Sequence, residues 1–218
     1  VCAVEAGSGV SQMRFSNDGT TWSAWEPYAT SKTWTLLPGI GSKTVYVQFM
    51  DGAGNWSNSF STSIYYNPVQ PFPFSDDFST DKGWGGYEVG AWERKPAVAG
   101  GGENGNPDPA TDHSASGDNY ILGFAIGGDY PNNLVERAIV SPPINCTGQN
   151  QVFLKFWRYL NVQSNHSDHA KIYVSNDETN WTQRWENPIF DLTDNGWKQV
   201  VFDISAIAAN QATVYIKF

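Results

Sequence analysis

Apolar and polar residues alternate along several short stretches of the first third of the chain. Val45, Val47 and Phe49 alternate with Thr, Tyr and Gln, and the same period of two recurs over residues 60–66. Side chains that repeat at every second residue lie on one face of a β-strand. Residues 1–67 are therefore predicted to form the short strands of a β-sandwich.

The alternation returns after residue 73. Ala170, Ile172 and Val174 face one way in their segment, and no amphipathic helical stretch accompanies the apolar runs. The chain is therefore predicted to be all-β, with two sheets packed face to face in this region. The strands predicted here are residues 120–125, 134–140, 152–160, 170–175, 199–204 and 213–218.

A proline-rich segment, residues 67–73 with the sequence NPVQPFP, separates the two regions. Segments of this composition are extended and semi-rigid. The sequence therefore predicts two tandem β-sandwich domains, residues 1–67 and residues 74–218, joined by a linker at residues 68–73.

Two near copies of one turn sequence, Ser-Asn-Asp-x-Thr-x-Trp, occur at residues 16–22 and 175–181. The Asn-Asp pair favours an Asx-type turn between two strands. The first copy is expected to join strands at residues 12–16 and 21–25. We interpret the repeat as shared hairpin chemistry rather than as a duplicated domain.

The predicted strand at residues 152–160 breaks the alternation, because large side chains occupy both of its faces. Two interpretations stay open. Either a loop such as residues 99–122 covers the second face, or that face is an aromatic platform that binds carbohydrate through Trp157 and Tyr159.

Residues 99–122 form a long run without an apolar period, rich in Gly and Pro, that carries Asp108, Asp112 and Asp118. Loops longer than roughly 12–15 residues are usually functional or disordered. Carboxylates and exposed backbone carbonyls are ligands that Ca²⁺ prefers. The loop is therefore either ordered by Ca²⁺ or a disordered surface segment.

The composition narrows the range of functions. The 218 residues include only 13 Lys and Arg and carry a net charge of −9, which argues against a nucleic-acid partner because few cations would contact phosphates. No apolar run approaches the roughly 20 residues that cross a bilayer. The many Trp, Tyr, Phe, Thr and Asn residues are typical of extracellular β-proteins. Cys2 and Cys146 lie in different predicted domains and are expected to be free, buried thiols.

No catalytic motif accompanies the acids and histidines. His113, His166 and His169 each neighbour Asp or Ser, but the sequence contains no H-E-x-x-H pair and no G-x-S-x-G turn. A glycosidase would need two carboxylates across a cleft, which sequence spacing cannot place. The chain is therefore predicted not to be an enzyme.

Longer phrases carry a first resemblance. GSGVSQMRFSNDGTTWSAWEP followed by KTVYVQFMDGAGNWS is similar to the immunoglobulin-like or fibronectin-type-III-like repeats of large secreted bacterial proteins. Such repeats are spacers or adhesive modules, so the resemblance implies no catalytic residue. A seven-stranded immunoglobulin-type sandwich needs roughly 100 residues, so this domain is expected to be N-terminally incomplete.

Residues 74–218 resemble the MAM-like jelly-roll domains of secreted bacterial metallopeptidases of the immune-inhibitor type and, less closely, cleaved-adhesin modules. The phrases that carry the resemblance include DDFSTDKGW, PDPATDHSASGDNYIL, AIVSPPINCTG and DHAKIYVSNDETNWTQRWEN. The resemblance implies a structural Ca²⁺ held by Asp77 and Asp112, and Asp108 and Asp118 are further candidate ligands. Such domains usually close with another strand that carries consecutive Asp residues, so this one is expected to be C-terminally incomplete.

These observations predict a non-catalytic adhesion or recognition module of a secreted or surface bacterial protein, stabilised by Ca²⁺ and binding carbohydrate or protein. Two alternatives stay open: an accessory domain of a secreted peptidase or glycosidase, and a structural subunit. Predicted strands at residues 1–5 and 212–218 stand at the two ends of the sequence, so each sandwich is expected to expose a sheet edge. An uncovered edge accepts another strand, so one interpretation is self-assembly by strand addition. The other interpretation is that these ends are only the limits of this sequence.

Overall fold

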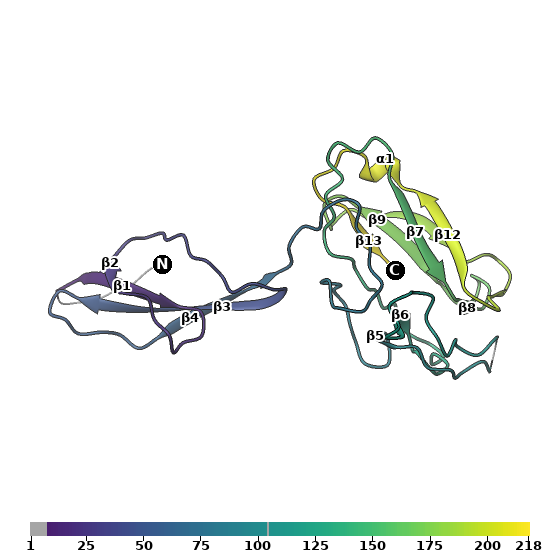
Figure 1. Ribbon diagram of the computed structural model, residues 1–218, viewed down its shortest axis with the longest axis horizontal. Helices are drawn as coiled ribbons and strands as arrows, with labels where there is room; N and C mark the ends of the chain where they lie inside the picture. The colour runs from purple at the N-terminus through teal and green to yellow at the C-terminus, as the bar shows by residue number, and fades with distance from the viewer. Residues whose placement is uncertain (1–7, 104) are drawn as a thin grey trace. The chain divides into compact units, whose positions relative to one another are not determined.

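The computed structural model describes residues 8–103 and 105–218, and the chain divides into two compact units, Val1–Asn67 and Pro68–Phe218 (Figure 1). Strands build both units, and the helix α1 (Ser205–Ala208) is a single short turn. The predicted all-β fold class is confirmed. In the part of the chain that the structure describes, no helix is long and apolar enough to span a membrane.

The first unit contains an antiparallel sheet with the strand order β2-β1-β3-β4. Met13, Phe15 and Phe49 point to one side of this sheet and are buried, because Tyr28 and Trp34 from the connection between β2 and β3 pack against them. The period-two pattern therefore predicted β3 and β4 correctly. The strands are β1 (Val10–Ser16), β2 (Glu26–Pro27), β3 (Gly41–Asp51) and β4 (Phe60–Tyr66).

The segment after β1 differs from the predicted hairpin. Residues 21–25 form no strand, and only the two residues of β2 pair with β1. Ser23 explains the difference, because its N–H donates to the Phe15 carbonyl and its hydroxyl accepts the Phe15 N–H. The Ser23 side chain thus makes one of the two hydrogen bonds to the Phe15 backbone that a paired strand would make.

Two sheets pack face to face in the second unit (Figure 1). One has the order β10-β9-β13, and the other pairs β12 with β7. Ile172 and Val174 of β9 meet Leu154 and Phe156 of β7 in the core between them. The bounds are β7 (Phe153–Arg158), β9 (Lys171–Ser175), β10 (Thr182–Glu186), β12 (Lys198–Asp203) and β13 (Tyr215–Lys217).

Smaller strand pairs flank this sandwich: β5 with β6, and β8 with β11. The strand predicted at residues 134–140 is wrong over most of its length, since Leu134 and Val135 are exposed and only its end pairs, where Ile139 and Phe218 exchange backbone hydrogen bonds. The remaining bounds are β5 (Trp92–Pro96), β6 (Tyr120–Phe124), β8 (Asn161–Val162) and β11 (Leu192–Thr193).

Residues 68–73, expected to be a separate linker, pack with the second unit. The Gln70 N–H donates to the Pro143 carbonyl, and the Gln70 carbonyl accepts the Asn145 N–H. The middle of the proline-rich segment is thus held by backbone hydrogen bonds beside Ile144.

Cys146 is a free thiol that is buried in the core of the second unit, as predicted. Burial raises the pKa of this thiol, which keeps it protonated and unreactive. Cys2 and the strand expected at residues 1–5 lie outside the described residues.

Candidate functional site

The outer face of the β7–β12 sheet carries a strip of exposed apolar side chains. Phe153 and Trp157 of β7 are 52% and 42% exposed, and Val201 of β12 is 55% exposed. We call these three residues the outer strip. Leu154 and Phe156 of β7 point the other way, into the core. The two large faces of this strand therefore have separate roles, one in the core and one facing solvent.

The glycine-rich loop, residues 99–119, lies against one end of the outer strip. The His113 ring stacks on Trp157 with ring centroids 3.6 Å apart and planes inclined by 17°. Close by, the Trp197 Nε1–H donates to the Thr111 carbonyl over 3.0 Å. The loop therefore contacts the aromatic face of this strand and yet leaves Trp157 exposed.

Tyr159, the second predicted ligand-binding residue, contacts the loop more closely than Trp157 does. Its hydroxyl donates to the Pro107 carbonyl over 2.9 Å, and its ring meets the Trp197 ring edge-on at 5.9 Å. Tyr159 is half-buried. It therefore fastens the loop, whereas Trp157 presents the more accessible ring.

Polar side chains border the outer strip. The β7–β12 register places Gln199 opposite Trp157 and Asp203 opposite Phe153, and Lys155 lies between the two aromatic residues on the same face. All three polar residues are exposed. The strip thus combines flat apolar surface with an amide, a carboxylate and an ammonium group.

Two of the predicted metal ligands, Asp77 and Asp118, lie beside the hydroxyl of Ser79. The Ser79 N–H and then its hydroxyl lower the pKa of Asp77. The Tyr120 N–H and then the Ser79 hydroxyl lower the pKa of Asp118. The Ser79 Oγ itself is buried and makes no hydrogen bond of normal geometry.

Asp112 is connected to this pair through two serines. The Ser114 hydroxyl donates to the Asp112 carboxylate, the Ser114 and Ser116 hydroxyl oxygens are 2.6 Å apart, and the Ser116 hydroxyl donates to Asp118 over 2.8 Å. We call Asp77, Asp112 and Asp118 the acidic cluster. The structure therefore links three of the four predicted ligands by a chain of oxygen contacts.

Asp108, the fourth predicted ligand, has other partners. Its carboxylate accepts the Gly127 N–H over 2.8 Å, and its own N–H donates to the Gly100 carbonyl. Burial raises the pKa of Asp108, and the nearby Asp129 carboxylate adds to the effect. Asp108 therefore fastens the glycine-rich loop to the turn after β6.

Within residues 8–103 and 105–218, no three His, Cys, Asp or Glu side chains converge as a ready metal site. The histidines have other contacts: His113 stacks on Trp157, and the His169 Nδ1 lies 2.8 Å from a Glu186 oxygen. Any cation at the acidic cluster would therefore need hydroxyl, carbonyl or water oxygens in addition to its carboxylates.

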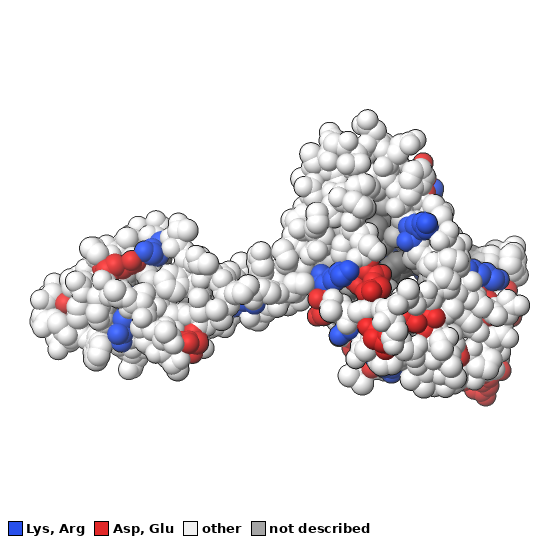
Figure 2. Space-filling model, in the orientation of Figure 1, with Lys and Arg blue, Asp and Glu red and all other residues white. Residues whose placement is uncertain are grey.

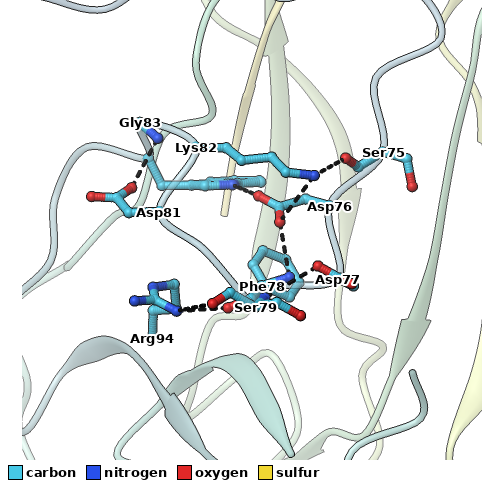
Figure 3. A network of polar contacts seen from close by, with 10 residues as sticks. Ser75, Asp76, Asp77, Phe78, Ser79, Asp81, Lys82, Gly83 and Arg94 are labelled. Carbon is cyan, nitrogen blue, oxygen red and sulfur yellow. Dashed lines mark hydrogen bonds and ion pairs between the residues drawn. The ribbon is translucent and has the colours of Figure 1, made fainter. Parts of the chain in front are cut away.

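Asp76 is a buried acid that sequence reasoning missed. Its side chain is 3% exposed and accepts the Phe78 N–H over 2.8 Å and the Trp84 Nε1–H over 2.9 Å, while the Lys82 Nζ lies 3.7 Å away (Figure 3). Its neighbour Asp77 is exposed. No sequence signal distinguishes these two adjacent acids, and only the fold assigns Asp76 to the interior.

Arg94 of β5 holds the same segment from the other side. Its guanidinium donates to the Phe78 carbonyl over 2.7 Å and to the Ser79 carbonyl over 3.2 Å (Figure 3). Phe78 has a left-handed φ of 64°, which a non-glycine residue adopts only when its surroundings hold it there. Asp76 and Arg94 together fix the turn that presents Asp77 and Ser79.

Charged side chains are sparse on the face that Figure 2 shows, and most of its surface is uncharged. Lys and Arg are interspersed with Asp and Glu there rather than gathered in one basic patch.

Comparisons with known proteins assign no family to the chain. No family model matches it, and no curated protein matches it. One solved structure, from work on the promiscuous specificity of carbohydrate-binding modules of the β-sandwich superfamily, aligns with 97% of this chain and 79% of its own, at 10% identity and a TM-score of 0.27. Similarity at this level carries no functional argument, so the proposals below rest on the geometry of this chain.

Proposed function

We propose that the chain is a non-catalytic recognition module of a secreted or surface bacterial protein, and that it binds carbohydrate on the outer strip of the second unit. The observation that supports this most directly is Trp157, a residue 42% exposed on the solvent face of a sheet. Exposed apolar patches on folded domains often mark binding surfaces. The spacer or adhesive role that the first family resemblance implies for residues 1–67 agrees with a recognition module.

A sugar ring suits the chemistry of the strip. Its C–H faces pack on aromatic rings, and its hydroxyls exchange hydrogen bonds with amide, carboxylate and ammonium groups. Gln199 and Lys155 supply such groups beside Trp157. Because these strands also build the core, the aromatic surface is held on a sheet rather than on a loop, which reduces the ordering cost of binding.

His113 limits the site, because it covers one face of the Trp157 indole. A bound sugar would contact the remaining exposed surface, towards Phe153 and Val201. Removing the imidazole would uncover the second face of the indole. The variant His113→Ala is therefore expected to bind more tightly if that face can accept a sugar.

The test is titration of the full chain with cello-, xylo- and chito-oligosaccharides, followed by calorimetry and by the indole N–H signals in NMR spectra. At least one series should bind. Trp157→Ala should then weaken binding about fivefold to tenfold, since stacking on one ring contributes about 1–1.5 kcal/mol.

Trp56→Ala is the matched control, because Trp56 is 64% exposed but belongs to the first unit. It should leave the affinity unchanged. Equal loss in both variants, or no binding to any series, would contradict the carbohydrate proposal.

We propose further that Ca²⁺ stabilises the second unit at the acidic cluster. Three oxygen–oxygen contacts lead from Asp112 through Ser114 and Ser116 to Asp118. The two serine hydroxyls supply only two protons, so one of the three contacts has no proton between its oxygens. The Ser79 hydroxyl, which lies beside both Asp77 and Asp118, adds another oxygen to this group. These residues therefore fit a hard cation, which would supply the missing positive charge to them.

Chelation tests this second proposal. A site filled at 100 times its dissociation constant stabilises the fold by roughly 2.7 kcal/mol, so the second unit should melt at a higher temperature in Ca²⁺ than in EDTA. Asp118→Asn should abolish the difference, whereas Asp81→Asn should not, because Asp81 bonds only the Gly83 N–H. Identical melting in Ca²⁺ and EDTA would falsify the proposal.

A further inference from the structure

The two edges of the sheet in the first unit differ in how they are protected. The edge strand β2 has only two residues, Glu26 and Pro27, and so combines a charge with a residue that lacks an N–H. The opposite edge strand, β4, has seven residues, and all of them are exposed. Phe60–Tyr66 contains neither a charged residue nor Pro. Charged residues and Pro on an edge strand normally prevent another strand from pairing with it. The edge strand β2 therefore has this protection, and the edge strand β4 lacks it.

The apolar face of the sheet continues onto this open edge. Phe60 pairs with Val47 in the β3–β4 register, and its ring centroid lies 6.2 Å from that of the core residue Phe49. Phe60 and Ile64 are nevertheless 57% and 60% exposed. Both residues therefore carry the pattern of core positions but lack a covering layer among the described residues.

We infer that β4 pairs antiparallel with β4 of a second copy of this chain, about a two-fold axis at Ser63. In that register Phe60 faces Tyr66 of the other copy, and Thr62 faces Ile64. The pairing joins the two four-stranded sheets into one continuous sheet. It also places side chains of the second copy, Tyr66 and Thr62, beside the exposed Phe60 and Ile64.

Self-complementarity favours a second copy over an unrelated strand. Reversing the strand about Ser63 sets Phe60 opposite Tyr66 at both ends of the pairing, so the two-fold axis forms the same aromatic cross-strand pair twice. The strand itself is neutral although the whole chain carries a net charge of −9. A two-fold interface of this kind closes on itself, so the product is a dimer rather than a fibre.

Sedimentation equilibrium of the full chain across the micromolar range tests the inference. The natural chain should show a concentration-dependent monomer–dimer equilibrium. Ser63→Lys places two ammonium groups opposite each other at the axis, and Ser63→Asp places two carboxylates there. Each variant alone should dimerise roughly tenfold more weakly, because like charges meet in the interface. An equimolar mixture should recover the affinity as a mixed dimer.

The mixture separates the interface from damage to the strand, because a misfolded β4 would not be restored by a second misfolded copy. Thr20→Lys adds the same charge at an exposed turn and should leave the dimer intact. A natural chain that stays monomeric at every concentration, single variants that dimerise normally, or a mixture that stays monomeric would each overturn the inference.

Discussion

The two Ser-Asn-Asp-x-Thr-x-Trp turns, one in each unit, share their hydrogen bonds but not their surroundings. In both, the Asp carboxylate accepts the hydroxyl of the Ser two residues earlier and the N–H groups two and three residues later. These bonds hold the pKa of Asp18 and of Asp177 far below the usual range. One local sequence thus builds one turn in two different sheets.

The chain that follows the two turns differs. After the second turn, four residues of β10 pair with β9 across a register shift, whereas after the first turn only the two residues of β2 pair. The Trp at the end of each turn packs over a different cation: Trp22 lies 5.0 Å from the Arg14 guanidinium, and Trp181 lies 4.4 Å from the Lys217 ammonium. The comparison shows that local sequence sets the turn, and that the neighbouring strand decides whether a hairpin follows.

Replacing the Asp of each turn by Ala is expected to have the largest effect on the two turns. Asp177 accepts one more side-chain bond than Asp18 does, from the Asn180 amide over 2.7 Å. We therefore expect Asp177→Ala to expose residues 171–186 to hydrogen exchange more than Asp18→Ala exposes residues 10–27. Exchange measured by mass spectrometry on peptides from each turn checks this. Equal protection in the natural chain and both variants would show that neighbouring strands alone hold the turns.

Lowering the pH should weaken both turns less than replacing the Asp by Ala does, because a protonated Asp still accepts some hydrogen bonds. The folded-state pKa of each Asp lies below its ordinary value of 3.8. The contribution of each carboxylate is therefore complete above that value and is lost as the pH falls below it. Urea unfolding between about pH 5 and about pH 2 should show this loss. Asp177→Asn should flatten the pH dependence of the second unit, and a profile as steep as that of the natural chain would contradict the assignment.

Alternation predicted β3, β9 and β13 because each of these strands has one face towards a core, and it also predicted β4, although all residues of β4 are exposed. The same rule missed the short strands β8 and β11, whose two residues are too few to show a period. It also placed a strand at residues 134–140, where apolar Leu134 and Val135 are exposed. An exposed apolar residue and a buried one can be the same amino acid, so the sequence alone cannot tell which of them lies in the core.

The candidate sites show the same limit. The sequence singled out Trp157 because both faces of its strand are large, but it gave no sign that His113 would stack on that ring. The resemblance singled out Asp77 rather than its neighbour Asp76, whose carboxylate the fold buries beside Phe78, Lys82 and Trp84. A contact between residues distant in sequence decides the first case, and a local turn whose shape the sequence does not reveal decides the second.

The smallest expected effect concerns the residue that follows the Asp in each turn. Gly19 and Glu178 both adopt a left-handed φ, of 74° and 61°, which costs an L-residue roughly 1 kcal/mol more than it costs Gly. A Cβ at Gly19 would meet the Tyr46 ring at an ordinary 3.4 Å, so the backbone conformation dominates. Gly19→Glu should therefore destabilise the first unit by about 1 kcal/mol. Glu178→Gly should stabilise the second by only about 0.5 kcal/mol, because Gly also adds entropy to the unfolded chain. Urea unfolding of both variants checks the signs, and a stabilising Gly19→Glu would show that the two turns are not equivalent at this position.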